Sequence, residues 1–70
     1  MSHKEVFENR LSEIDKDFKV KKDGKAFVYE LSDVSETYSL IGLAAHFKNR
    51  EWIKDYGYIY IMKHIVEIYY

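Results

Sequence analysis

The sequence lacks cysteine and proline altogether and contains only three glycines. Without cysteine the chain can form neither a disulfide nor a thiolate-bound metal site. Without proline it cannot use the turns that depend on a fixed φ angle. The glycines, at positions 24, 42 and 57, are too scattered to form a phosphate-binding loop. A chain of 70 residues with these restrictions must therefore rely on a dense apolar core or on a partner.

Long apolar runs and an excess of charge of one sign are also missing. No stretch approaches the roughly 20 apolar residues that a transmembrane helix needs. His3, Lys4 and Glu5 interrupt the first apolar run that a signal peptide would require. The net charge is −1, so no global field attracts the chain to nucleic acid or to an anionic membrane. We therefore expect a cytoplasmic protein without a membrane partner.

The residues that are present are typical of one ordered domain. Hydrophobic residues make up 47% of the chain, aromatic residues 17% and charged residues 33%, a mixture that argues against disorder. We expect a single compact domain over residues 1–70. Its predicted fold class is α+β, in the order helix, β-hairpin, helix, helix, with a two-stranded antiparallel sheet packed on the helices.

Two amphipathic helices follow from capping residues and apolar spacing. Ser2 and Glu5 have the spacing of a capping box at the start of the first helix. Its apolar residues recur at helical intervals: Phe7, Leu11, Ile14 and Phe18. A further helix is predicted from about Ser35 to Lys48, with Asp33 or Ser35 as its N-cap.

Between these helices the sequence predicts a β-hairpin. Asp23-Gly24 is a residue pair preferred in type I′ turns. Such a turn sets a register of three pairs: Lys22 with Lys25, Val20 with Phe27, and Phe18 with Tyr29. Side-chain alternation then defines an apolar face of Phe18, Val20, Phe27, Tyr29 and Leu31. It also defines an opposite face of Lys19, Lys21, Val28 and Glu30. Because a lone hairpin is marginally stable, we expect helices to cover the apolar face.

The C-terminal segment, residues 50–70, has two competing interpretations. Strand propensity is high after Tyr58, but alternation fails because Lys63, His64 and Glu67 do not share one face of a strand. At helical spacing the polar residues form one continuous stripe: Gly57, Tyr60, Lys63, His64 and Glu67. We therefore predict a helix, with a strand as the alternative. The helix would be apolar over about half of its circumference, whereas a surface helix needs an arc of only about 100°.

This apolar excess predicts an association surface. Exposed apolar patches mark contact sites, tyrosine and methionine are enriched in interfaces, and a short chain gains stability by dimerisation. We therefore predict a protein partner or a homodimer. The predicted contacts are Tyr58, Ile61, Tyr69 and Tyr70 in the C-terminal segment, together with the acidic residues Glu30, Asp33 and Glu36. The alternative, that the whole arc is buried inside this domain, stays open.

No pattern in the sequence indicates catalysis. His3, His46 and His64 are isolated from one another, and the chain contains no nucleophile elbow, phosphate loop or HExxH motif. We therefore expect no enzyme activity, no cofactor, no metal and no small-molecule substrate.

DNA binding is the second class of function that the sequence indicates. Residues 43–47 and 50–56 resemble the core pattern of a helix-turn-helix, although the turn is about one residue short and lacks glycine. The candidate phosphate contacts are Lys19, Lys21, Lys22, Lys25, Arg50 and Lys54. Lysines on an edge strand also prevent unwanted strand pairing, and this second interpretation stays open.

The sequence therefore favours a non-catalytic protein-interaction module. We expect a small regulator or inhibitor of the kind that phages and mobile elements encode. The alternative is a small DNA-binding regulator with a degenerate helix-turn-helix and a basic hairpin wing. The protein partner is favoured because the predicted recognition helix carries only Arg50 and Lys54 as basic residues, beside Glu51 and Asp55.

Overall fold

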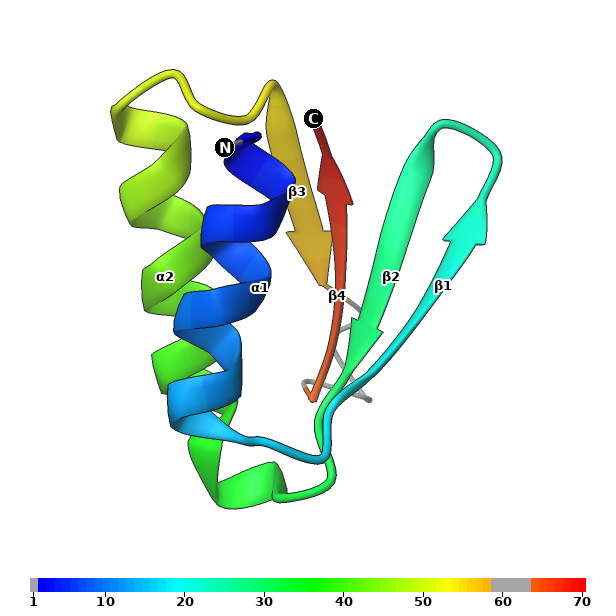
Figure 1. Ribbon diagram of the computed structural model, residues 1–70, viewed down its shortest axis with the longest axis vertical. Helices are drawn as coiled ribbons and strands as arrows, with labels where there is room; N and C mark the ends of the chain where they lie inside the picture. Colours follow the sequence, from blue (N-terminus) through cyan, green and yellow to red (C-terminus); the bar gives the residue numbers. More distant parts are fainter. Residues whose placement is uncertain (1, 59–63) are drawn as a thin grey trace.

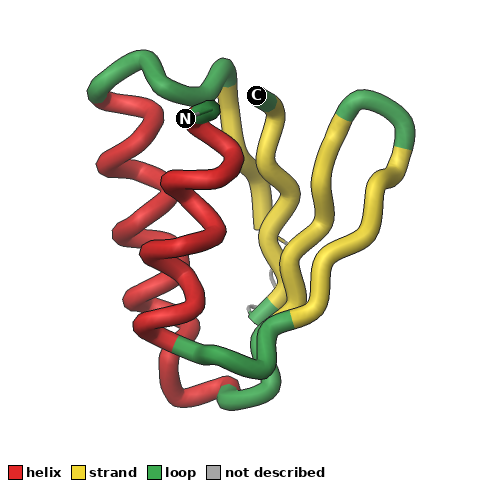
Figure 2. Tube along the Cα trace, in the orientation of Figure 1, coloured by secondary structure: helices red, strands yellow, loops and turns green. Residues whose placement is uncertain are grey.

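In the part of the chain that the structure describes, two α-helices pack on one side of a four-stranded antiparallel sheet (Figures 1 and 2). The computed structural model describes residues 2–58 and 64–70, apart from the side chain of Tyr58. The elements in chain order are α1 (His3–Ile14), β1 (Lys19–Asp23), β2 (Ala26–Glu30), the 3-10 helix η1 (Val34–Glu36), α2 (Thr37–Asn49), β3 (Asp55–Tyr58) and β4 (Ile65–Tyr69). The strand order across the sheet is β1-β2-β4-β3. The α+β class is confirmed, but the predicted two-stranded sheet is too small.

Helix α1 begins where its capping residue predicts. The Glu5 backbone N–H donates to Ser2 Oγ at 3.2 Å, which satisfies one of the free donors at the helix start. The helix buries Phe7 and Leu11 against the sheet. It ends at Ile14, so Phe18 lies beyond the helix and packs on the core from the following loop.

Asp15 fastens the end of α1 to the loop that follows β2. Its carboxylate accepts hydrogen bonds from the Ser32 hydroxyl at 2.7 Å and from the backbone N–H groups of Ser32 and Asp33 at 2.7 and 2.9 Å. The backbone N–H of Asp17 donates to the same carboxylate at 3.1 Å. The Ser32 hydroxyl, followed by the backbone donors, holds the pKa of Asp15 below its usual range. The charged carboxylate therefore stabilises this junction.

The β1–β2 hairpin has the predicted faces but not the predicted register. Val20 lies opposite Tyr29 and Lys22 opposite Phe27, so the two turn residues are Gly24 and Lys25. A type I′ turn at Asp23-Gly24 would need a positive φ at Asp23, which costs about 1–2 kcal/mol outside glycine. The observed turn needs a positive φ at Gly24, where it is +62°. The residue opposite Val20 changes from the predicted Phe27 to Tyr29, a shift of two residues, so the side chains keep their predicted faces.

The C-terminal segment forms strands, so the predicted third helix is wrong. Burial alternates along β4, with Val66 and Ile68 fully buried and Ile65, Glu67 and Tyr69 half-buried. The alternation test failed at the sequence level because it included Lys63 and His64. His64 lies in a turn before β4, and Lys63 lies outside the described residues. The β-branched and aromatic residues therefore follow their strand propensity.

The core lies between the helices and one face of the sheet. Phe7 is its centre, with ring centroids 5.2 Å from both Tyr29 and Phe47. Ten buried residues make up this cluster: Phe7, Leu11, Tyr29, Leu31, Leu40, Ala44, Phe47, Ile53, Val66 and Ile68. Helix α2 supplies three of them, and it ends at Asn49, one residue beyond the predicted Lys48. Asp33 is the N-cap of η1, directly before α2, and its carboxylate accepts from the Ser35 N–H at 2.9 Å.

Candidate functional site

The helices cover only one face of the sheet, and the opposite side is the candidate interaction surface. We call it the open face. Strand alternation and pairing place eight of the larger side chains of β1, β2 and β4 on it: Lys19, Lys21, Asp23, Val28, Glu30, Ile65, Glu67 and Tyr69. Ala26 on β2 and Asp55 on β3 share this face. Strands β1, β2 and β4 lie next to one another in the sheet. The sheet backbone therefore fixes their relative positions.

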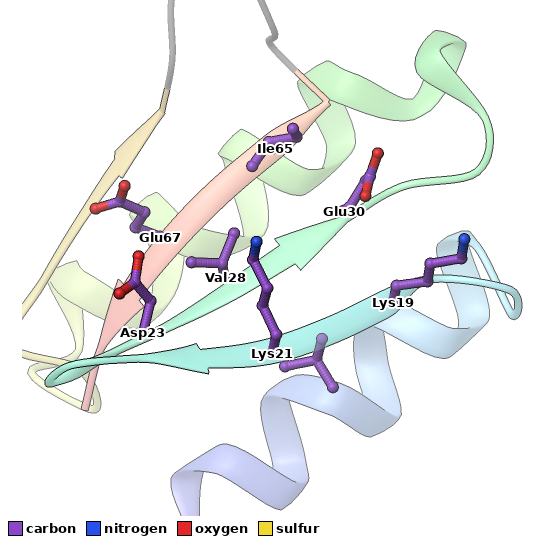
Figure 3. Close-up of a pocket in the computed structure, with 8 residues that line it drawn as sticks. Lys19, Lys21, Asp23, Val28, Glu30, Ile65 and Glu67 are labelled. Carbon is purple, nitrogen blue, oxygen red and sulfur yellow. The ribbon is translucent and has the colours of Figure 1, made fainter.

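The open face has an apolar centre inside a hollow of about 430 Å³ (Figure 3). Val28 and Ile65 are half-buried there although no described helix covers them. The lining residues are Lys19, Val20, Lys21, Asp23, Val28, Glu30, Ile65 and Glu67. Figure 3 shows Lys21, Val28 and Glu67 projecting to the same side of the sheet. This combination of a small apolar centre and a polar rim is typical of protein-interaction surfaces.

Charges of both signs surround the apolar centre. Lys19 and Lys21 lie on the edge strand β1, and no described carboxylate forms an ion pair with either of them. Glu30 lies on β2 directly opposite Lys19, and Glu67 lies on β4, across Val28 from Lys21. With Asp23, the acidic residues outnumber the lysines on this face. A phosphate backbone therefore meets more repulsion than attraction here.

One hydrogen bond orients part of the acidic rim. The Tyr69 hydroxyl donates to Glu67 Oε2 at 2.9 Å, and this bond raises the pKa of Tyr69. His64 Nε2 lies 3.6 Å from Glu30 Oε2, beyond hydrogen-bonding distance. The Glu67 carboxylate is therefore oriented within the folded chain.

The two predicted C-terminal contact residues whose side chains the structure describes, Tyr69 and Tyr70, do not share one surface. Tyr69 lies on the open face. Tyr70 packs inside the domain instead, because its hydroxyl lies 2.5 Å from that of Tyr29 and its ring contacts Phe7 and Phe27. Burial raises the pKa of Tyr70 to about 12. Ile61 and the side chain of Tyr58 lie outside the described residues. The apolar helix that motivated this prediction is replaced by strands over residues 55–58 and 65–69.

The three acidic residues predicted as partner contacts also lie in different places. Glu30 belongs to the open face. Asp33 is committed to the N-cap of η1, where the Ser35 hydroxyl and backbone N–H lower its pKa. Glu36 is half-buried at the end of η1. Of the three, Glu30 is therefore the one that the structure places beside an apolar centre.

The predicted helix-turn-helix is wrong. Residues 51–54 form a turn and bends, and residues 55–58 form β3, so no second helix follows α2. Arg50 is the C-cap of α2 and lies over the Trp52 ring, and Lys54 follows in the connection to β3. These two residues lie near β3, the edge of the sheet opposite β1.

The basic hairpin residues point in different directions as well. Lys19 and Lys21 lie on the open face, Lys25 lies in the turn, and Lys22 lies on the opposite face with Nζ 5.9 Å from the centroid of Phe27. The six predicted phosphate contacts therefore do not form one continuous surface.

The sequence predicts the correct face for Val28. It does not identify Val28, Ile65 or Glu67 as site residues. The alternation of the hairpin contained the signal for Val28. Ile65 and Glu67 could not be found while the C-terminal segment was interpreted as a helix.

Two of the described histidines contact the same aromatic ring, and the third, His64, lies beside Glu30. His3 stacks on Trp52 with a centroid distance of 5.8 Å, and His46 contacts the edge of the same ring at 5.9 Å. Across residues 2–58 and 64–70, no three His, Asp or Glu side chains gather closely enough to hold a metal ion.

The comparisons with known proteins gave no relative. No protein-family model matches the chain, and the searches of curated proteins and of solved structures found no match either. Neither helix within the described part of the chain has the length and hydrophobicity of a membrane-spanning segment. The functional argument therefore depends on the geometry of the open face.

Proposed function

We propose that this chain is a non-catalytic protein-interaction module, a small regulator or inhibitor that binds its partner through the open face of the sheet. The observation that carries this proposal is the half-buried apolar pair, Val28 and Ile65, on a sheet face that no described helix covers. A sheet with one packed face usually turns a polar face to water. Here the centre of that face is apolar and hollow.

The charge distribution supports a protein partner over a nucleic acid. Lys19 and Lys21 are outnumbered by Asp23, Glu30 and Glu67 on the same face. A polar rim of mixed sign gives orientation and specificity in protein interfaces, whereas phosphate recognition needs an excess of positive charge.

The proposal is tested by NMR. The isotope-labelled full chain is titrated with extract from the cells that express it, and its amide signals are followed. We expect the amide signals of Val28, Ile65 and Glu67 to shift or broaden. Signals of Tyr38 and Gly42, which are exposed on α2, should stay unchanged. Perturbation confined to α2, or none on the open face, would contradict the proposal.

Two aspartate substitutions sharpen this test. Val28→Asp introduces a charge at the centre of the open face and should abolish the perturbation. Tyr38→Asp is the control, because Tyr38 is 76% exposed on α2, which packs on the other side of the sheet (Figure 1). It should leave the response intact.

A further inference from the structure

We infer that the partner which occupies the open face is a second copy of this chain, related to the first by a two-fold axis that runs along β2. This inference rests on the proposed function and names its partner. It depends on the arrangement of Lys21, Val28 and Glu67, which form one row across three neighbouring strands.

The row is self-complementary in charge. Val28 pairs with Lys21 on β1 and with Glu67 on β4, so the two charges lie one strand spacing, about 4.8 Å, on either side of it. A two-fold axis along β2, between two facing sheets, exchanges β1 and β4. Each Lys21 then lies over the partner's Glu67, and the two Val28 side chains meet on the axis. The contact between Lys21 and the partner's Glu67 therefore forms twice, as in an isologous interface.

The neighbouring row adds one favourable and one unfavourable contact. It consists of Lys19, Glu30 and Ile65. The same axis places the aliphatic part of Lys19 over the partner's Ile65, which a lysine side chain can cover while its ammonium group stays in water. It also brings Glu30 towards the partner's Glu30. Repulsion between these carboxylates opposes association, so the removal of this charge should tighten the dimer.

The size of the face sets the strength of the contact. The axis along β2 superposes three strands, β1, β2 and β4. At about 4.8 Å per strand and about five residues of 3.3 Å each, they give a contact face of roughly 14 by 17 Å. Stable dimers bury about 800 Å² per partner, which is more than this face supplies. We therefore expect a reversible dimer that dissociates at micromolar or higher concentration.

The test is sedimentation equilibrium of the full chain over a range of about 10 µM to 1 mM. The wild type should change from monomer to dimer. K21E should raise the dissociation constant at least about tenfold, because two attractive contacts become repulsive. E67K should have a similar effect, and the double variant K21E/E67K should return to within about threefold of the wild type. E30Q should tighten the dimer.

Lys22→Glu is the matched control, since Lys22 is the neighbouring lysine on the opposite face of β1. Its dissociation constant should match the wild type. A chain that stays monomeric at 1 mM overturns the inference, and so does a dimer that K21E leaves unchanged. In either case the titration with cell extract still tests the proposed function separately, because an open face that responds to another protein supports that function without a second copy. Circular dichroism confirms that each variant is folded. Lys21 is exposed on an edge strand, so K21E should fold like the wild type and can decide the test even if another variant does not fold.

Discussion

The backbone of Glu51 offers a direct test of how α2 ends. Its φ angle is +61°, in the left-handed region that favours glycine. The N–H of Trp52 donates to the Phe47 carbonyl at 2.9 Å, and the N–H of Glu51 donates to the Lys48 carbonyl at 2.9 Å. These two bonds define a Schellman motif, in which glycine is the usual residue at the position of Glu51. The contact between the Trp52 and Phe47 rings, with centroids 5.2 Å apart, completes it.

We expect Glu51→Gly to stabilise the domain. The left-handed conformation costs a residue with a Cβ atom about 1–2 kcal/mol. Glycine also makes the unfolded chain more flexible, which offsets about 0.4–1 kcal/mol of this gain. The net increase in the free energy of unfolding should be about 0.5–1 kcal/mol. For a domain of this size that corresponds to a rise in Tm of about 2–8 °C, which thermal unfolding by circular dichroism resolves.

Glu51→Ala separates the backbone effect from the loss of charge. Alanine removes the carboxylate but keeps the Cβ atom, so the conformational cost remains. Its Tm should change by less than half of the gain seen with glycine, since a charge near a helix end contributes only a few tenths of a kcal/mol at an exposed site. An equal rise in both variants, or a fall in Glu51→Gly, would refute the assignment of strain to this backbone.

Three further substitutions test the core and its polar connections. Phe7→Ala removes a fully buried ring and should cost about 3–5 kcal/mol, enough to leave most of so small a domain unfolded at 25 °C by near-UV circular dichroism; a loss below about 1 kcal/mol would show that Phe7 is not central. Tyr29→Phe takes away the hydroxyl that donates to Glu8 Oε2 at 2.8 Å and contacts the Tyr70 hydroxyl, so urea unfolding should show a loss of about 1–3 kcal/mol; unchanged stability would contradict that network. The folded pKa of Asp15 lies below its unfolded value of about 3.8, so its contribution is present above pH 3.8 and is lost as the pH falls through the folded pKa. Asp15→Asn should therefore be less stable at neutral pH and show a weaker loss of stability below pH 4, and a steeper loss than the wild type would contradict this role.

The local signals of the N-terminal half predict its structure well. The Ser2 cap, the burial of Phe7 and Leu11, and the two faces of the hairpin follow from capping chemistry and from alternation alone. The register does not, because glycine at position 24 fits two turn types. The difference between them lies in the φ angle that Asp23 would have to adopt.

In the C-terminal half, local sequence patterns do not predict the secondary structure. Its apolar residues fit both a helix and a strand, and the polar residues that decided for a helix include His64, which lies in a turn. The deciding factor is not local. Strand β2 has a free edge after it pairs with β1, and β4 satisfies the hydrogen bonds of that edge while it buries Val66 and Ile68. The open face could not be predicted without this pairing, since Ile65 and Glu67 reach it only through β4.

The claim that the open face binds a protein is tested most directly by photo-crosslinking in the cells that express the chain. A benzoylphenylalanine in place of Tyr69 lies on the open face, and the same residue in place of Tyr38 lies on α2, where the native side chain is 76% exposed. Irradiation should give a discrete adduct from position 69 and none from position 38. An adduct of twice 8.4 kDa identifies a second copy, and a different mass identifies another protein. Adducts from position 38 alone, or from neither position, would contradict the account.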